Sequence, residues 1–439
     1  METSPRINLF FTLFEAQLVR SYLESDKGEF FKNIASRYNL IVITNLDLSD
    51  YISQRLRLFN VHADVIPVDL TCFKESMLAK IAGFYLRWND KSLTTRKKLH
   101  SSSWKSKHLI IKQTLRLILH YVIPLFLPVI GFFRKTYYYS IDVQGLLPAI
   151  RLPKDNNVSI VFLSSLTNYW EDVVCGAYFR SFGCKVVAST RSWDNLLSHG
   201  QLRFLPDIFL SHSKFMTDTA INHQGLREKT VLQWVTPTYR TQFIPAKFNK
   251  RMDTSHIIYA SMGLASNPDD LNFIQRLIEL NQRFSFDIDL SLLLHPKFNS
   301  HVDNIKLPGN FSRKTFQYDE TSLSEYYDFL GSADLLICSG TTAGLDSCFL
   351  GKKVAIVGYE IIPQNRWTSG LRCLDLMPHT SQFYKRAGLP IINNEKELVA
   401  LLTGTKEVGD YKTNVIQDFT GDPNTNFFEI FTSSLRHVS

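Results

Sequence analysis

Short apolar runs alternate with longer helical stretches along most of the chain, and this alternation limits the possible folds more than any other feature. Strand-like runs in the first half lie at 7–12, 40–44, 62–68, 158–163, 184–189 and 207–211. Continuous apolar runs are typical of buried parallel strands, and the stretches between them suit the helices that cross such a sheet. The first half therefore predicts βα units and a parallel sheet.

A second series of βα units begins after a polar, basic stretch at 237–253, which contains Pro237 and Pro245. Its strands are predicted at 257–261, 289–294, 335–338 and 354–357, its helices at 268–284 and 343–350, and a closing helix at 424–436. A chain of 439 residues is too long for one ordinary core. We therefore expect an N-terminal Rossmann-like domain over 1–240, completed by a C-terminal helix over 416–439, and a second one over 250–415.

The first domain carries a predicted helical insertion at about 75–140. From Lys91 to Arg116 there are eight basic residues and no acid, and 117–133 is apolar except for His120. Pro124 and Pro128 disfavour a transmembrane helix here, whereas a basic stretch beside an apolar one suits an anionic membrane surface. A helical hairpin packed on its own domain is the alternative. The net charge of +8 does not indicate nucleic-acid binding, because the basic run flanks an apolar segment.

The six cysteines are scattered, with no CxxC pair and no zinc spacing. They predict small core residues of a reduced, cytosolic protein, and we expect no metal site. The first residues also lack the charged-then-apolar order of a signal peptide. The expected location is therefore cytoplasmic, on the inner face of the cell membrane.

The strongest chemical signal is the segment from Ser339 to Asp346, which leads from a predicted strand into a predicted helix. Gly340 and the hydroxyls of Ser339, Thr341 and Thr342 let backbone amides approach an anion at the helix N-terminus. Asp346 lies one to two turns into the helix, where a carboxylate can accept hydrogen bonds from ribose hydroxyls. Many helices are simply capped in this way, so the turn alone is a weak signal.

Together with Gly351-Lys352 before the next strand, this segment resembles the donor-binding element of GT-B glycosyltransferases. The resemblance implies that the glycine turn binds the phosphate of a nucleotide-activated sugar and that Asp346 binds its ribose. Many retaining members carry a glutamate eight residues before the ribose acid, where this chain has Cys338. That departure favours an inverting mechanism. The resemblance also implies two domains that face a central cleft.

Two further strand ends in the second half carry candidate donor-binding residues. His295-Pro296 resembles an element of bacterial sialyl- and Kdo-transferases and of teichoic-acid glycerophosphotransferases. The resemblance implies a cytidine-linked donor whose phosphate His295 contacts, stabilises or protonates. No counterpart of the sialyltransferases' acidic motif is present, which speaks against a sialic acid donor. Gly263 allows the backbone to approach a phosphate closely, or simply forms a strand-to-helix turn.

In the first half, Arg191-Ser192-Trp193-Asp194-Asn195 follows a predicted strand and resembles a segment of surface-carbohydrate proteins related to glycerophosphotransferases. Asp194 is a candidate base for the acceptor hydroxyl, and Glu15, beyond the first strand, is its rival. Arg191, Trp193 and Asn195 are candidate acceptor-binding residues. The alternative is an Asp-Asn turn that caps a helix.

These features predict a metal-independent glycosyltransferase that needs no cofactor besides its nucleotide sugar. Its acceptor would be a lipid-linked molecule or an oligosaccharide in surface polysaccharide synthesis, such as O-antigen or capsule. A CDP-polyol phosphotransferase keeps the fold and changes the chemistry, and an inert GT-B binding module is the non-enzymatic alternative. A nucleotide-sugar 2-epimerase shares the fold, but its acids lie closer to the Ser-Gly turn than Asp346 does.

Overall fold

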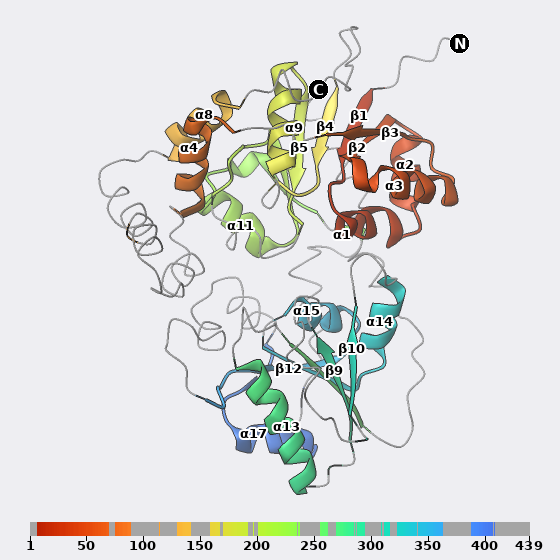
Figure 1. Ribbon diagram of the computed structural model, residues 1–439, viewed down its shortest axis with the longest axis vertical. Coiled ribbons are helices and arrows are strands. Elements are labelled where there is room, and N and C mark those ends of the chain that lie inside the picture. Colours follow the sequence, from red (N-terminus) through yellow and green to blue (C-terminus); the bar gives the residue numbers. More distant parts are fainter. Residues whose placement is uncertain are drawn as a thin grey trace. The chain divides into compact units, whose positions relative to one another are not determined.

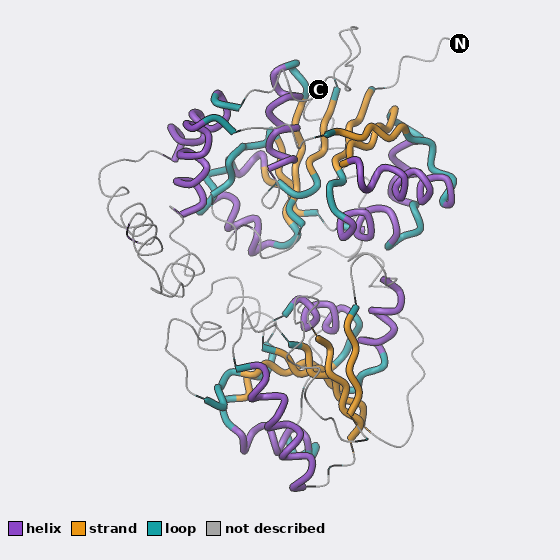
Figure 2. The backbone as a smooth tube through the Cα atoms, in the orientation of Figure 1, coloured by secondary structure: helices purple, strands orange, loops and turns teal. Residues whose placement is uncertain are grey.

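Two compact units make up the chain, Met1–Thr238 with Phe419–Ser439, and Tyr239–Asp418. The structure is a computed structural model, and it describes residues 7–69, 75–88, 114, 130–141, 159–166, 170–191, 196, 201–234, 236–237, 255–261, 269–284, 286, 288–294, 309, 311–316, 323–339, 341–362, 388–406 and 408. In each unit the strands gather in the middle with helices around them (Figures 1 and 2). The predicted domain boundaries at 240, 250 and 415 and the closing helix lie outside the described residues.

The sheet of the first unit has seven parallel strands in the order β3-β2-β1-β4-β5-β6-β7. Its strands are β1 (Asn8–Thr12), β2 (Asn39–Asn45), β3 (Asp64–Val68), β4 (Ile160–Leu163), β5 (Lys185–Ser189), β6 (Ile208–Ser211) and β7 (Val231–Gln233). Every residue of β1 and of β4 is buried, which explains the wholly apolar sequence of β4 and the apolar centre of β1 between Asn8 and Thr12. The chain leaves β1 towards β3 and later returns to the other side of β1, so the connections reverse direction between β1 and β4.

Helices of the first unit follow the expected alternation. They are α1 (Ala16–Val19), a π-helical turn (Arg20–Glu24), α2 (Glu29–Ala35), α3 (Leu46–Leu58), α4 (Met77–Trp88), α8 (Ile130–Tyr139), α9 (Trp170–Ser181), α11 (Lys214–Asn222) and a 3-10 turn (Glu228–Thr230). Phe11 of β1 stacks on Phe162 of β4 with ring centroids 4.5 Å apart, and Tyr22 stacks on Trp234 at 5.9 Å. This aromatic cluster joins the sheet to the helices that follow β1.

The described part of the predicted insertion consists of α4 and α8, which lie side by side in Figure 1. Tyr85 and Phe133 stack at 3.8 Å, and the Tyr137 hydroxyl donates to Glu75 at 2.6 Å. The predicted basic and apolar runs, which lie between these two helices in the sequence, fall almost entirely outside the described residues. Within the described residues, no helix has the length and apolar character needed to span a membrane.

The second unit has six parallel strands in the order β10-β9-β8-β11-β12-β13. They are β8 (Ser255–Ala260), β9 (Ile288–Leu294), β10 (Phe311–Thr315), β11 (Leu335–Cys338), β12 (Lys353–Val357) and β13 (Ile391–Ile392). Its helices are α13 (Asp270–Phe284), α14 (Leu323–Gly331), α15 (Thr342–Phe349) and α17 (Glu395–Leu402). Here the connections reverse direction between β8 and β11. The predicted fold of two Rossmann-like α/β domains is confirmed.

Three strands were not predicted, and each lies at the edge of a sheet. Four of the five residues of β10 are exposed, and β7 and β13 have only three and two residues. An edge strand is covered less completely than a central one, so it needs no continuous apolar run. The sequence pattern therefore found the centres of both sheets and one edge strand, β3, and missed the other three edge strands.

Candidate functional site

The reversal point of the second sheet lies between β8 and β11, and open parallel sheets bind ligands at the carboxyl ends of such strands. The Tyr259 hydroxyl of β8 donates to Asp270 Oδ1 at 2.6 Å and lies 3.2 Å from Ser339 Oγ, directly after β11. All three residues are buried. The network ties the start of α13 to the turn that leads into α15.

Helix α15, like α1 and α2, begins without a side-chain cap, whereas α3, α11 and α17 have one. Asn45, Ser213 and Asn394 each accept a backbone N–H at the start of α3, α11 and α17. Thr341 occupies the same position of α15 in extended backbone conformation, yet its hydroxyl caps no amide. That oxygen is buried and has no hydrogen-bond partner in the described part of the chain. The Gly344 amide donates to the Thr341 carbonyl at 3.0 Å, and the Thr341 hydroxyl is left for a ligand at this helix start.

Asp346 lies on α15 and is 6% exposed. Its Oδ2 accepts a hydrogen bond of 2.9 Å from the hydroxyl of Tyr326 on α14. Burial raises the pKa of Asp346 to about 7, and the Tyr326 hydroxyl opposes that rise. The predicted ribose acid is thus a carboxyl group poised between its two protonation states, held by a tyrosine that the sequence did not indicate.

Gly344 lets α15 pack directly on the sheet. A Cβ at this position would lie 2.8 Å from Sγ of Cys338, the last residue of β11. Cys338 is fully buried and faces the helix, so its position belongs to the interface between α15 and the sheet. A glutamate at 338 would point into this interface, and the stereochemical prediction drawn from Cys338 stays a prediction.

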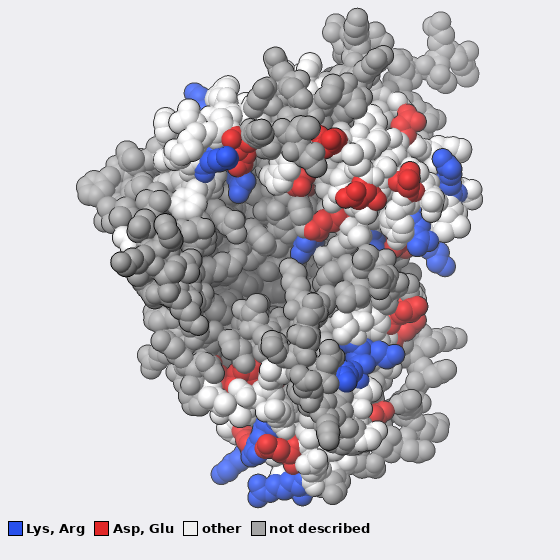
Figure 3. All heavy atoms as spheres, in the orientation of Figure 1, with Lys and Arg blue, Asp and Glu red and all other residues white. Residues whose placement is uncertain are grey.

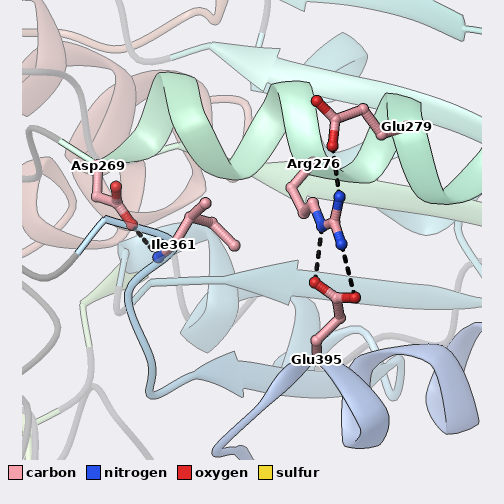
Figure 4. A network of polar contacts seen from close by, with 5 residues as sticks. All are labelled: Asp269, Arg276, Glu279, Ile361 and Glu395. Atoms are coloured by element: carbon pink, nitrogen blue, oxygen red, sulfur yellow. Dashed lines mark hydrogen bonds and ion pairs between the residues drawn. The ribbon is translucent and has the colours of Figure 1, made fainter.

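Acids at the start of α13 hold the segment that follows β12. Asp269 accepts backbone N–H bonds from Ile361 at 2.7 Å and from Ile362 at 3.2 Å (Figure 4). On the same helix, Arg276 forms a two-point ion pair with Glu395 at the start of α17, at 2.7 and 2.8 Å (Figure 4). These contacts fix the carboxyl end of β12 beside those of β8 and β11.

In the first unit, two predicted residues form an ion pair. Nη1 of Arg191, after β5, contacts both carboxylate oxygens of Glu15, after β1, at 2.8 and 3.1 Å. Glu15 was predicted as a base and Arg191 as an anion-binding residue, so the structure brings together two groups that had separate predicted roles.

Two acids at the start of α9 were missed. Asp172 is fully buried, accepts hydrogen bonds from the Thr12 hydroxyl and from the Ser165 amide at 2.7 Å, and has its pKa raised by burial to about 7. Glu171 precedes it and lies near enough to Glu15 to feel its charge. Acids in the first turn of a helix are ordinary stabilising residues, so their sequence position carried no functional signal.

Several predicted residues lie outside the described residues: Trp193, Asp194, Asn195, Gly263, His295, Pro296 and Gly340. Within the described residues there is no group of three or more His, Cys, Asp or Glu side chains placed to hold a metal ion. The four described cysteines, Cys175, Cys184, Cys338 and Cys348, are buried free thiols, as predicted. On the face drawn in Figure 3, described basic and acidic side chains are interspersed.

Solved structures with a similar architecture include UDP-N-acetylglucosamine 2-epimerases and glycosyltransferases. A putative UDP-N-acetylglucosamine 2-epimerase from Listeria monocytogenes aligns over 99% of this chain and 96% of its own, with 11% identity and a TM-score of 0.54. A UDP co-structure of S. aureus MnaA aligns over 98% and 95%, with 11% identity and a TM-score of 0.51. A glycosyltransferase from Rickettsia africae aligns over 99% and 98%, with 11% identity and a TM-score of 0.46.

No protein-family model and no curated protein sequence matches the chain. Because the identities are so low, the structural likenesses show the fold alone. The fold is the GT-B arrangement of two Rossmann-like domains that the sequence predicted.

Proposed function

We propose that this chain is a GT-B glycosyltransferase whose second unit binds a nucleotide-activated sugar. The observation that carries the proposal is the uncapped start of α15, where Thr341 presents a buried hydroxyl without a partner. Free amides and a hydroxyl at a helix N-terminus suit a diphosphate or phosphate group. Asp346, less than two turns further along, is the candidate partner of the ribose hydroxyls. No step in this arrangement requires a metal ion.

The identity of the nucleotide is the next part of the proposal to test. His295-Pro296 favours a cytidine-linked donor through its resemblance to Kdo-transferases, whereas MnaA, which has the same fold, was solved with UDP. Both nucleotides present the same phosphate chemistry to α15, so binding measurements must identify which nucleobase the protein prefers. From a CDP-polyol donor, the polyol phosphate would be transferred to the acceptor. An inert module would bind the nucleotide-activated donor without cleaving it.

A second candidate is epimerisation of the nucleotide sugar, favoured by the fold likeness to the putative epimerase at a TM-score of 0.54. The position of Asp346 relative to the Ser-Gly turn favours transfer. Product analysis separates the two, because an epimerase returns an isomeric nucleotide sugar and a transferase releases the nucleotide.

For the acceptor, we propose a lipid-linked or oligosaccharide hydroxyl compound of surface polysaccharide synthesis, reached at the cytoplasmic face of an anionic membrane. Support comes from α4 and α8, where Met77, Leu78 and Phe132 are 72%, 60% and 60% exposed. These helices flank the basic run from Lys91 to Arg116. Apolar side chains beside basic ones suit an anionic lipid surface. Sedimentation with phosphatidylglycerol vesicles tests this, and binding should fall with added salt.

The central experiment is a thermal shift series with UDP, CMP, CDP, GDP and TDP, with and without EDTA. One nucleotide should raise the melting temperature, since a ligand that binds the folded state stabilises it. Thr341→Val should abolish that shift, whereas Ser213→Ala, which alters a helix start in the first unit, should leave it intact. Absence of any shift in the wild-type protein would refute the proposed function.

A further inference from the structure

The start of α9 carries polar groups that the donor site does not use. Asp172 fixes this helix start by accepting the Ser165 amide and the Thr12 hydroxyl, and Thr12 Oγ1 in turn accepts the Ser164 amide at 3.0 Å. Thr12 ends β1, and both serines follow β4. The group therefore lies at the reversal point of the first sheet, where parallel sheets bind their ligands.

Three oxygen atoms of this group are buried without a hydrogen-bond partner in the described part of the chain. They are the hydroxyls of Ser164 and Ser165, both residues being 0% exposed, and Oε2 of Glu171. A buried polar atom left without a partner destabilises a folded protein. Three such atoms at one strand end indicate a place where a ligand supplies the missing hydrogen bonds. Hydroxyl groups match them, because a hydroxyl both donates and accepts.

Glu15 and Glu171 differ in how many of their carboxylate oxygens have a partner. Both oxygens of Glu15 accept hydrogen bonds from Nη1 of Arg191. Glu171 keeps one oxygen without a partner. Burial raises the pKa of Glu171, and the charge of Glu15 adds to that rise.

We propose that Glu171 is the catalytic base that receives the proton of the attacking acceptor hydroxyl. This inference rests on the proposed function. The acceptor O–H bond breaks and its proton passes to Oε2 of Glu171, while the acceptor oxygen bonds to the anomeric carbon. The bond from that carbon to the phosphate oxygen breaks, and its electron pair leaves with the nucleotide. Asp172 is a positioning residue, and Arg191 holds in place Glu15, whose charge adds to the raised pKa of Glu171.

Substitution to glutamine at three positions tests the assignment. Glu171→Gln and Glu15→Gln change the two candidate bases, and Glu29→Gln changes an exposed acid that also lies in the first turn of a helix. Release of UDP from UDP-N-acetylglucosamine and of CMP from CMP-N-acetylneuraminic acid and CMP-Kdo is measured with water as acceptor. General-base catalysis contributes about 10²–10⁴-fold, so Glu171→Gln should slow release at least about 100-fold. Glu15→Gln should slow release by less, and Glu29→Gln should match the wild type.

The pH profile of kcat/KM adds a readout that would not change if Glu171 had only a structural role. The wild-type kcat/KM should fall at acid pH as Glu171 becomes protonated, and Glu171→Gln should lack this acid limb. Glu171→Asp should keep the limb at a lower rate. The described charged or titratable groups around Glu171 are Glu15 and Arg191 from the strand ends, and Asp172 and Cys175 on α9.

Failure of the inference can be told apart from failure of the proposed function. The nucleotide-induced melting shift belongs to the second unit and should be unchanged in Glu171→Gln. If that variant binds nucleotide and releases it at a rate within threefold of the wild type, Glu171 is not the base. A larger loss of nucleotide release in Glu15→Gln than in Glu171→Gln would assign the proton to Glu15. A wild type that binds the nucleotide but does not cleave the nucleotide sugar also overturns the inference. If the wild type binds no nucleotide, the proposed function fails first.

Discussion

The two units repeat one local design at the reversal point of their sheets and equip it with different chemistry. In each, the strand after the reversal runs into a helix that carries a buried acid with a pKa near 7, Asp172 on α9 and Asp346 on α15. Each helix also has a glycine packed on that strand, Gly176 against Leu163 and Gly344 against Cys338. The shared geometry is therefore a scaffold feature.

The difference lies in what surrounds the two buried acids. In the first unit, charged Glu15, Glu171 and Arg191 gather around Asp172. In the second unit, Asp346 meets the hydroxyl of Tyr326. Fixed charges suit proton transfer and orientation of hydroxyls, whereas neutral donors at a helix start suit an anion that brings its own charge. The same scaffold thus carries charged groups in one unit and a neutral hydroxyl partner in the other.

The largest expected effect is the pH dependence of stability in both units. Between about pH 4 and pH 7 each folded unit keeps a proton on its buried acid that the unfolded chain has already lost, so the unfolding free energy falls as the pH rises. With folded-state pKa values near 7, we expect a loss of about 3 kcal/mol in each unit across this range. Hydrogen exchange of α9 and α15 amides between pH 5 and pH 8 measures each unit separately, after correction for the intrinsic exchange rate.

Asparagine substitutions sharpen this first prediction. Asp346→Asn should remove the pH slope of α15 and leave that of α9, and Asp172→Asn should do the reverse. Salt should weaken the slope in the first unit more, because only Asp172 lies near charged acids. Equal salt effects in the two units would contradict the contrast between charged and neutral surroundings.

The second prediction concerns the two packed glycines. Gly344→Ala should destabilise the second unit by about 2 kcal/mol, because the Sγ of Cys338 has little room to move in a buried strand. Gly176→Ala should cost less, since the atom nearest its Cβ is the tip of the Leu163 side chain, which can rotate. Gly131→Ala on α8 meets nothing within 4 Å and should be neutral or stabilising. Urea unfolding followed by hydrogen exchange measures all three.

A double substitution checks the cause. Cys338→Ala removes the opposing sulfur atom, so Cys338→Ala with Gly344→Ala should be more stable than the sum of the two single changes predicts. If the effects add, the close approach of the helix to β11 does not explain the glycine at 344.

How much of this was predictable from sequence depends on the type of signal. Apolar runs revealed β1, β4, β8 and β11, because strands buried on both faces are mostly apolar. The start of α15 was also predictable, because small and hydroxylated residues often precede a helix. Edge strands such as β10 gave no such signal.

The partners of the site could not be predicted, because they act from elements whose patterns indicate only core or surface. Tyr259 lies in an apolar strand and Tyr326 in an amphipathic helix, so neither pattern shows that its hydroxyl meets an acid. Glu171 and Asp172 follow Trp170 at a helix start, where acids are ordinary. Only the register of β1 against β4 brings Asp172 to Thr12, and such long-range pairing is not written in local sequence.

The smallest expected effect compares two helix starts. Ser213 accepts the Met216 amide at 3.1 Å, so Ser213→Ala should destabilise α11 by about 1 kcal/mol. Thr341 caps no amide, so Thr341→Val should change the stability of α15 by less than about 0.5 kcal/mol while abolishing nucleotide binding. Thermal unfolding with and without the nucleotide that binds best measures both quantities. If Thr341→Val were as destabilising as Ser213→Ala, the hydroxyl would have an ordinary capping role, and the start of α15 would not differ from that of α11.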